Sequence, residues 1–113
     1  MRFFEGEFDE AEDVFSAFLC DEADREGVDI LYAEYENGGY DGTAFVIFLK
    51  NGELFEVNAS HCSCHGLGDQ WYPEETSWED LQFRHNSIED PNLCALIEAE
   101  LARSFFYEDS IRL

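Results

Sequence analysis

The feature that most constrains this fold is an apolar segment followed at once by a turn signal. Residues 43–50 (TAFVIFLK) form the most apolar run of the chain, and Asn51-Gly52 follows directly. Asn-Gly is the strongest short signal for a two-residue β-hairpin turn, because both residues tolerate positive φ. Residues 53–59 (ELFEVNA) then alternate between two faces. We therefore predict an antiparallel hairpin in which 43–50 is a central strand.

A third strand is expected before this hairpin. Residues 28–35 (VDILYAEY) combine alternation with β-branched and aromatic side chains, a pattern typical of a strand. Residues 36–42 contain three glycines and should form the connecting turn. Three strands joined in sequence by tight turns predict an antiparallel meander.

Helices are predicted on both sides of the meander. Residues 8–20 place Val14, Phe15 and Phe18 at helical spacing opposite an acidic face, and this helix should continue to near Gly27. Thr76 and Glu79 have the spacing of a capping box, which should start a helix over 77–83. The pair Asp90-Pro91 should start a final helix that runs to about residue 106.

The expected architecture is a single α+β domain over residues 1–113. A three-stranded antiparallel β-meander packs against the N-terminal and C-terminal helices in the order α-β-β-β-α-α, and the first and last helices cover one sheet face. Hydrophobic residues make up 45% of the chain and aromatic residues 16%, which argues for a packed core and against disorder.

The charge of the chain excludes several classes of partner. There are 27 acidic and 6 basic residues, for a net charge of −21. Direct binding to nucleic acid or to an anionic membrane needs clustered lysine and arginine, which this chain does not have. No apolar run is long enough for a transmembrane helix, and the acidic N-terminal segment does not resemble a secretory signal. We therefore expect a protein of the cytoplasm with reduced thiols.

One segment is rich in metal-binding side chains. Residues 60–66 (SHCSCHG) contain two cysteines and two histidines, and His61, Cys62 and Cys64 are the candidate zinc ligands. Cys-x-Cys is shorter than the usual zinc spacing, so further ligands would have to come from Cys20, His85 or Cys94. The alternative is an ordered loop whose cysteines are small, semi-buried apolar residues.

No set of catalytic residues emerges. A nucleophilic cysteine is favoured by positive neighbours, which are rare in this chain. Adjacent carboxylates are expected by chance among so many acids, and no calcium loop or phosphate-binding loop is present. We expect a protein that is not an enzyme and has no required cofactor.

A resemblance covers about a fifth of the chain, from Glu56 to Thr76 (EVNASHCSCHGLGDQWYPEET). This segment resembles one found in small, uncharacterised proteins of bacteriophages and prophages, with the pattern S-H-C-S-C-x-G-x-x-x-Q-W-x-P-E-E-T. At the position of His65, the proteins of that family usually have an aromatic residue, so this chain departs from their pattern there. The resemblance implies a phage or mobile-element protein that acts in a bacterial cytoplasm, and it implies no activity.

These observations lead to the hypothesis of a DNA-mimicking inhibitor. Such a protein presents carboxylates to a basic nucleic-acid-binding protein of the host, such as a restriction or CRISPR nuclease or a repressor. The acids are densest near the N-terminus, with eleven between Glu5 and Asp29. The candidate partner-binding residues are Glu5, Glu7, Asp9, Glu10, Glu12, Asp13, Asp21, Glu22, Asp24, Glu34, Glu36, Asp41, Trp71 and Tyr72.

Two alternatives remain open. The first is a protein-binding or immunity-type module that uses the 60–78 loop, with Trp71 and Tyr72 as anchors, because these residue types are enriched at interface hot spots. The second is a small zinc-binding accessory protein. The sequence leaves open whether the protein is a monomer or a dimer.

Overall fold

The computed structural model describes residues 2–38, 40–62, 66–85 and 90–111, the last eight of these by their backbone alone. The protein is an α+β structure, as predicted, and its described residues form a five-stranded mixed sheet and four helices. The chain divides into two compact units, Arg2–Glu75 and Thr76–Leu113, and each is described by itself. Whether the chain acts as the single domain expected from its sequence stays a prediction.

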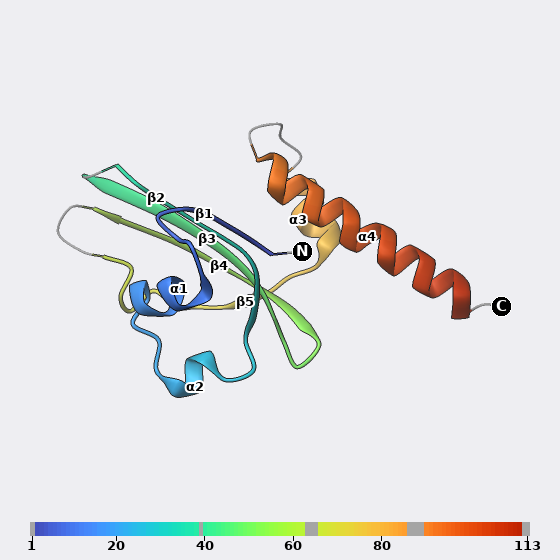
Figure 1. The fold of residues 1–113 in the computed structure, drawn as a ribbon, viewed down its shortest axis with the longest axis horizontal. Helices are drawn as coiled ribbons and strands as arrows, with labels where there is room; N and C mark the ends of the chain where they lie inside the picture. Colours follow the sequence, from blue (N-terminus) through green and yellow to red (C-terminus); the bar gives the residue numbers. More distant parts are fainter. Residues whose placement is uncertain (1, 39, 63–65, 86–89, 112–113) are drawn as a thin grey trace. The chain divides into compact units, whose positions relative to one another are not determined.

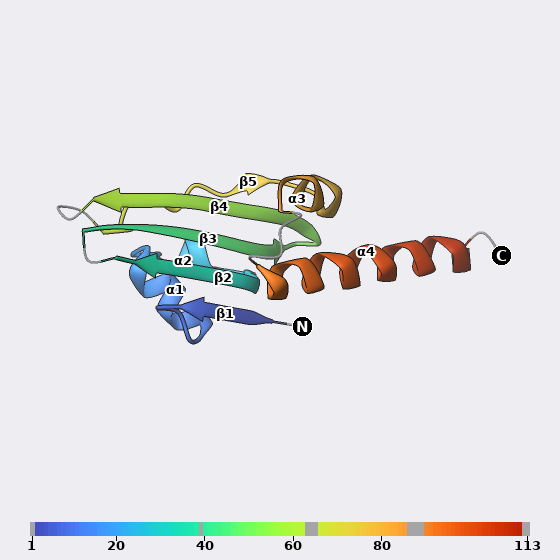
Figure 2. The same cartoon turned by 90° about the horizontal axis from the view of Figure 1, so that it is seen from above.

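The sheet lies entirely in the first unit (Figures 1 and 2). Its strands follow sequence order, from β1 to β5, across the sheet. Strand β1 pairs with β2 in parallel, and every other pair is antiparallel. The strands are β1 (Phe3–Gly6), β2 (Asp29–Asn37), β3 (Asp41–Lys50), β4 (Glu53–Cys62) and β5 (Glu74–Glu75).

The predicted three-stranded sheet is therefore corrected to five strands. Strands β2, β3 and β4 occupy the three predicted segments, but β1 and β5 were missed. They have four and two residues, too few to show a periodic pattern, and they form only through pairing with distant strands. The predicted order α-β-β-β-α-α is corrected to β-α-α-β-β-β-β-α-α.

The hairpin turn at Asn51-Gly52 is confirmed. Lys50 is paired with Glu53, which leaves a loop of two residues between β3 and β4. Both loop residues have positive φ, 54° for Asn51 and 79° for Gly52, as the favoured hairpin turns require. The ladder continues from this turn to the pair Asp41 and Cys62.

The predicted first helix is corrected to two short helices, α1 (Ala11–Ala17) and α2 (Glu22–Arg25). Leu19 has a φ of 54°, in the left-handed region that ends a helix. Asp21 then starts a new helix, because its side chain accepts a hydrogen bond from the Asp24 backbone N–H. The acidic pattern that suggested one long helix therefore contains a second helix start.

The core of the first unit lies between α1 and one face of the sheet (Figure 1). Helix α1 contributes Val14 and Phe15, and the residues just outside it, Phe8 and Phe18, are also buried. The sheet side of this core consists of Ile30, Ala33, Ala44, Val46, Phe48 and Val57. Leu67 from the loop after β4 completes it.

The second unit contains α3 (Trp78–Arg84) and α4 (Pro91–Ile111), which contact each other. The N-cap of α3 is Ser77, not Thr76, and its side chain accepts from the Asp80 backbone N–H at 3.2 Å. Helix α4 begins at Pro91 as predicted but extends beyond residue 106. The sequence also predicted that the first and last helices cover one sheet face. Helices α1 and α4 belong to different units, so this stays a prediction. Among the described residues, no helix is long and apolar enough to cross a membrane.

Gly6 provides a test of the β1–β2 pairing. Its φ is 68°, and a Cβ at this position would lie 2.1 Å from the Tyr35 carbonyl oxygen. We expect Gly6→Ala to lower the free energy of unfolding by more than the roughly 1–3 kcal/mol that a strained backbone alone costs, because the added Cβ would also collide with the Tyr35 carbonyl oxygen. Gly52→Ala is the control, because Gly52 shares the positive φ but has no neighbouring atom within 4 Å. Chemical denaturation measures both, and an equal loss in the two variants would contradict the close approach at Gly6.

Candidate anionic interaction surface

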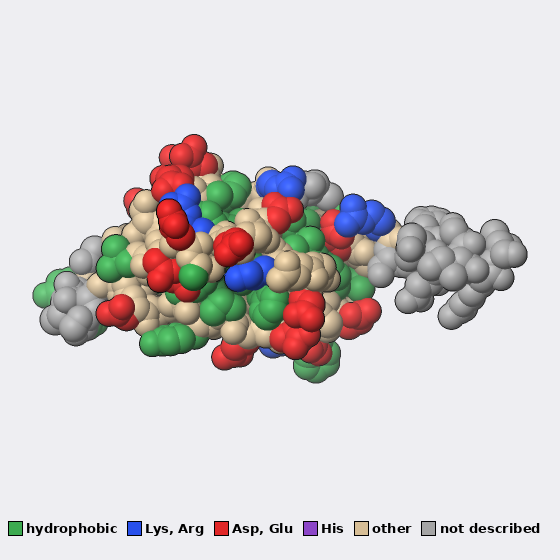
Figure 3. Space-filling model, turned by 90° about the horizontal axis from the view of Figure 1, so that it is seen from below, with side chains coloured by type: hydrophobic (Ala, Val, Ile, Leu, Met, Phe, Trp, Pro, Cys, Tyr) green, Lys and Arg blue, Asp and Glu red, His purple; other side chains and the backbone are tan. Residues whose placement is uncertain are grey.

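The negative charge is concentrated in the unit Arg2–Glu75. This unit contains nineteen acidic and three basic residues, and thirteen of the acidic residues are exposed. Arg2 is bound to Asp29 at 2.8 Å, and Arg25 is bound to Glu12. Both arginines of the unit are thus already paired with carboxylates. Figure 3 shows acidic side chains in separate groups, with hydrophobic and uncharged surface between them.

Three of the predicted partner-binding acids stabilise helix starts through their carboxylates. The Asp13 carboxylate accepts from the backbone N–H of Asp9 at 2.8 Å and of Glu10 at 3.2 Å, within the capping box of α1. Asp21 and Asp24 form the equivalent box of α2, with distances of 2.8 and 3.1 Å. Carboxylates near helix N-termini are also favoured by the helix dipole. Part of the acidity is therefore structural.

Glu12 is held in a different way. Its carboxylate binds the Arg25 guanidinium, whose carbon lies 4.7 Å from the centre of the Phe15 ring. The guanidinium is thus placed between a carboxylate and an aromatic face, which combines an ion pair with a cation–π contact. Glu22, on the same helix as Arg25, is exposed.

Glu5 and Glu34 are placed apart from the acids of α1 and α2. They pair across β1 and β2, and both carboxylates act on the hydroxyl of Tyr32, which donates to Glu34 Oε2 at 2.8 Å. Tyr32 is fully buried. Burial and these two carboxylates raise the pKa of Tyr32 far above its usual value. Glu5 and Glu34 therefore stabilise the neutral tyrosine.

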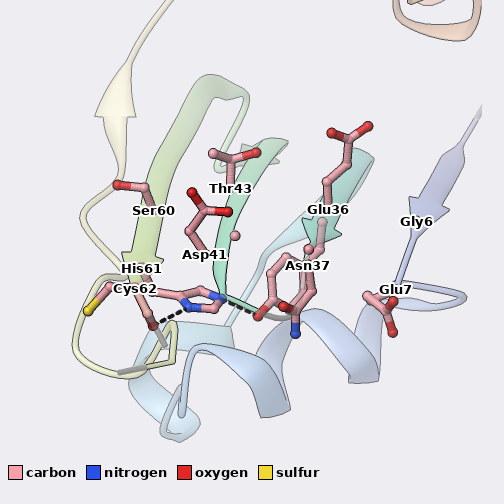
Figure 4. Close-up of a pocket in the computed structure, with 12 residues that line it drawn as sticks. Gly6, Glu7, Glu36, Asn37, Asp41, Thr43, Ser60, His61 and Cys62 are labelled. Carbon is pink, nitrogen blue, oxygen red and sulfur yellow. Dashed lines mark hydrogen bonds between the residues drawn. The ribbon is translucent and has the colours of Figure 1, made fainter. Parts of the chain in front are cut away.

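Three other predicted acids line one hollow. Glu7, Glu36 and Asp41 are all exposed and come from three separate segments of the chain. They line a cavity of about 820 Å³ near the ends of β1 to β4 (Figure 4), which we call the anionic hollow. Its lining residues are Gly6, Glu7, Tyr35, Glu36, Asn37, Gly38, Asp41, Gly42, Thr43, Ser60, His61 and Cys62.

The floor of the anionic hollow contains a tyrosine–histidine pair. His61 Nδ1 lies 2.9 Å from the Cys62 carbonyl oxygen, and because a carbonyl only accepts, Nδ1 donates (Figure 4). In the neutral ring Nε2 is then the acceptor, and the Tyr35 hydroxyl donates to it at 2.6 Å. Burial, with the Glu7 charge as a smaller cause, raises the pKa of Tyr35 and keeps this hydroxyl protonated.

Sequence reasoning missed Tyr35 and Gly42 at this site. A Cβ at Gly42 would lie 2.5 Å from His61 Nε2, so only glycine leaves room for the imidazole ring in its observed place. The signal was present in the hairpin register. The residues of β3 and β4 pair in order outward from the turn at Asn51-Gly52, and this order places Gly42 opposite His61.

The candidate zinc ligands are only partly described. Both ring nitrogens of His61 are used in hydrogen bonds, Cys62 is exposed, and Cys64 lies outside the described residues. Within the described ranges, no group of three or more His, Cys, Asp or Glu side chains is arranged to hold a metal ion. Cys94 donates its thiol to the His85 carbonyl oxygen at 3.2 Å. The zinc hypothesis stays a prediction.

Cys20, the remaining candidate, is poorly suited to chemistry that needs a thiolate. It lies between α1 and α2, and its side chain is partly buried. Burial is the main cause that raises the pKa of this thiol to about 11, and the Asp24 charge adds to it. The thiol therefore stays protonated at neutral pH, which disfavours both nucleophilic attack and metal binding.

The two predicted aromatic anchors have different positions. Trp71 is half-buried, makes edge contacts with Phe15 and Phe18, and stacks on Phe48 with ring centres 5.4 Å apart. Tyr72 is 72% exposed. Trp71 therefore contributes to the core of its unit, while the Tyr72 ring is available to a partner.

Comparisons with protein-family models, with curated proteins and with solved structures found no match to this chain.

Tyr32 gives this unit a defined response to alkali. Its folded pKa lies above the unfolded value of about 10, so the unfolded state loses its proton first. Stability due to this group is complete below about pH 10 and falls by about 1.4 kcal/mol per pH unit above it. Denaturation at several pH values above 10 measures this slope. We expect Tyr32→Phe to reduce the slope by about 1.4 kcal/mol per pH unit, which corresponds to one proton. An unchanged slope in Tyr32→Phe would contradict the assignment.

Proposed function

We propose that this protein is an acidic inhibitor that binds the basic, nucleic-acid-binding surface of a partner protein and competes there with nucleic acid. The observation that carries the proposal is that Glu7, Glu36 and Asp41 line the same anionic hollow. These carboxylates are exposed, whereas several other acids are engaged within the fold. Exposed carboxylates grouped around one hollow can occupy the places where a basic partner binds phosphates.

The rest of the unit supports this assignment by its net charge. With both arginines in ion pairs, little positive charge remains to weaken the attraction of a basic partner. The field of such a surface increases the association rate and acts most strongly at low ionic strength. The six basic residues are scattered along the sequence and are outnumbered by 27 acids, which favours a protein over nucleic acid as the partner.

The resemblance of residues 56–76 to phage proteins suggests the class of partner. We propose a nuclease or repressor of the bacterial host, including restriction and CRISPR nucleases, and action in the host cytoplasm. No catalytic step and no cofactor are part of this proposal.

The first test is capture followed by displacement. The immobilised protein is exposed to a bacterial lysate, and bound proteins are eluted either with salt or with duplex DNA. We expect nucleic-acid-binding proteins to be released by both, since they share one site with DNA. Captured proteins that resist both eluents, or the capture of no protein, would contradict the proposal.

The second test compares charge-neutralising variants of equal size. We expect Glu7→Gln, Glu36→Gln and Asp41→Asn combined to weaken binding to a captured partner roughly 3- to 100-fold, from about 0.2–1 kcal/mol per exposed pair. The matched control is Glu53→Gln, Glu74→Gln and Glu75→Gln, three exposed acids outside the anionic hollow. Titration calorimetry measures both. Equal weakening in the two variants would show that net charge, not the hollow, controls binding.

One observation favours the second candidate function, a protein-binding module that uses the 60–78 loop. The exposed Tyr72 ring directly follows Trp71, which fixes the local backbone by its core packing. If the loop is the interface, Tyr72→Ala should weaken binding with little dependence on salt. Under the proposed charge-based function, Tyr72→Ala should leave partner affinity unchanged, and affinity measurements at two salt concentrations separate the two functions.

A further inference from the structure

A second, smaller cavity of about 350 Å³ lies between α2 and the strands β3 and β4. Its walls are mostly apolar and aromatic, and its polar side chains are one carboxylate and one ammonium group. The lining residues are Ala23, Asp24, Phe48, Lys50, Phe55, Trp71 and Pro73. Mostly aromatic walls with a few polar groups are typical of a small binding site.

The aromatic walls form a continuous stack. Phe48 is almost fully buried and stacks on Trp71 with an interplanar angle of 12° and on Phe55 with one of 22°. Phe55 and Trp71 are half-buried, so part of each ring faces the cavity. This arrangement gives a flat cation two partly exposed aromatic groups against which it can stack.

We propose that this cavity binds an arginine side chain presented by the basic partner. The guanidinium would stack on Trp71 or Phe55 and pair with the Asp24 carboxylate. Asp24 accepts the Asp21 backbone N–H through Oδ2, and its second oxygen is the acceptor assigned to the guanidinium. The inference rests on the proposed function and names the side chain that the partner inserts.

The same unit already contains this kind of interaction. Arg25, on α2, lies over the Phe15 ring and pairs with Glu12, both of which belong to α1. A planar guanidinium suits such a site better than an ammonium group, because it stacks on rings and is more weakly hydrated. The cavity offers the same two components, a ring and a carboxylate, to an arginine from outside.

The charge around the cavity also favours a cation. Helix α2 and its flanks carry Asp21, Glu22, Asp24 and Glu26, while Arg25 is paired with Glu12. Lys50 is the one basic residue that lines the cavity, and its stem lies close to Gly27, with Cγ 3.9 Å from where a Cβ would be. Its long aliphatic stem can form part of the wall while the ammonium group stays in water.

The test uses the full chain and a defined probe, the peptide acetyl-Gly-Arg-Gly-amide. The Trp78→Phe background leaves Trp71 as the single tryptophan, so fluorescence reports on the cavity. We expect the arginine peptide to bind more tightly than the lysine peptide, and both more tightly than the neutral citrulline peptide. Equal affinity for the arginine and citrulline peptides at low salt would overturn the inference.

Variants of the walls locate the binding site. Phe55→Leu removes one ring, and Asp24→Asn removes the charge while keeping an acceptor for the capping box. We expect each to weaken arginine-peptide binding roughly 2- to 5-fold, the range of an exposed cation–π contact or ion pair. Glu74→Gln is the control of equal charge change outside the cavity and should have a smaller effect. Weakening by Glu74→Gln that equals the weakening by Asp24→Asn would overturn the assignment to this cavity.

Lys50→Gln distinguishes a cationic ligand from an anionic one. If the cavity binds arginine, removing the Lys50 charge should leave peptide affinity unchanged or increase it. A loss of arginine-peptide affinity in Lys50→Gln would overturn the inference. The peptide assay contains no partner protein, so its result is independent of the competition with DNA. Failure of the peptide to bind would contradict the arginine site alone, and failure to compete with DNA would contradict the proposed function.

Discussion

The structure depends above all on the register of the β3–β4 hairpin. The two-residue turn at Asn51-Gly52 fixes which residues of the two strands are opposite each other. Near the turn it pairs Phe48 with Phe55. These rings form part of the wall of the smaller cavity next to α2, here called the aromatic cavity. Far from the turn it pairs Gly42 with His61, which allows the imidazole to reach Tyr35. A slip of one residue would exchange the two sheet faces and destroy both sites.

The acidic residues have distinct physical roles. Like charges at this density repel one another and reduce stability. Part of that cost is offset where carboxylates cap helices, as Asp13 and Asp21 do, or pair with arginine, as Glu12 does. Among the described residues, no carboxylate of Glu7, Glu36 or Asp41 caps a helix or pairs with an arginine. These three acids are exposed, as several other acids are, but they line one hollow, and the proposed function rests on this grouping.

Local sequence patterns predicted the parts of the fold that local interactions determine. The α+β class and the hairpin turn followed from polarity patterns and from one dipeptide. Strand β1 could not be predicted, since its four residues are ordered by pairing with β2, which lies more than twenty residues away in sequence. The break between α1 and α2 was missed because Asp21 reads equally well as part of an acidic helix face. Of the site, the acids were found, but their grouping needs the sheet register.

The hairpin also sets a length. Along β3, Gly42 and Phe48 are six residues apart, so the anionic hollow and the aromatic cavity are separated by about 20 Å at ~3.4 Å per residue. The phosphates along one strand of duplex DNA repeat at about the same 3.4 Å of helix axis. The rise per residue of an extended strand is thus close to the axial rise per nucleotide of duplex DNA. Under the proposed function, a partner that contacts both sites would span an axial length of about six nucleotides of duplex DNA.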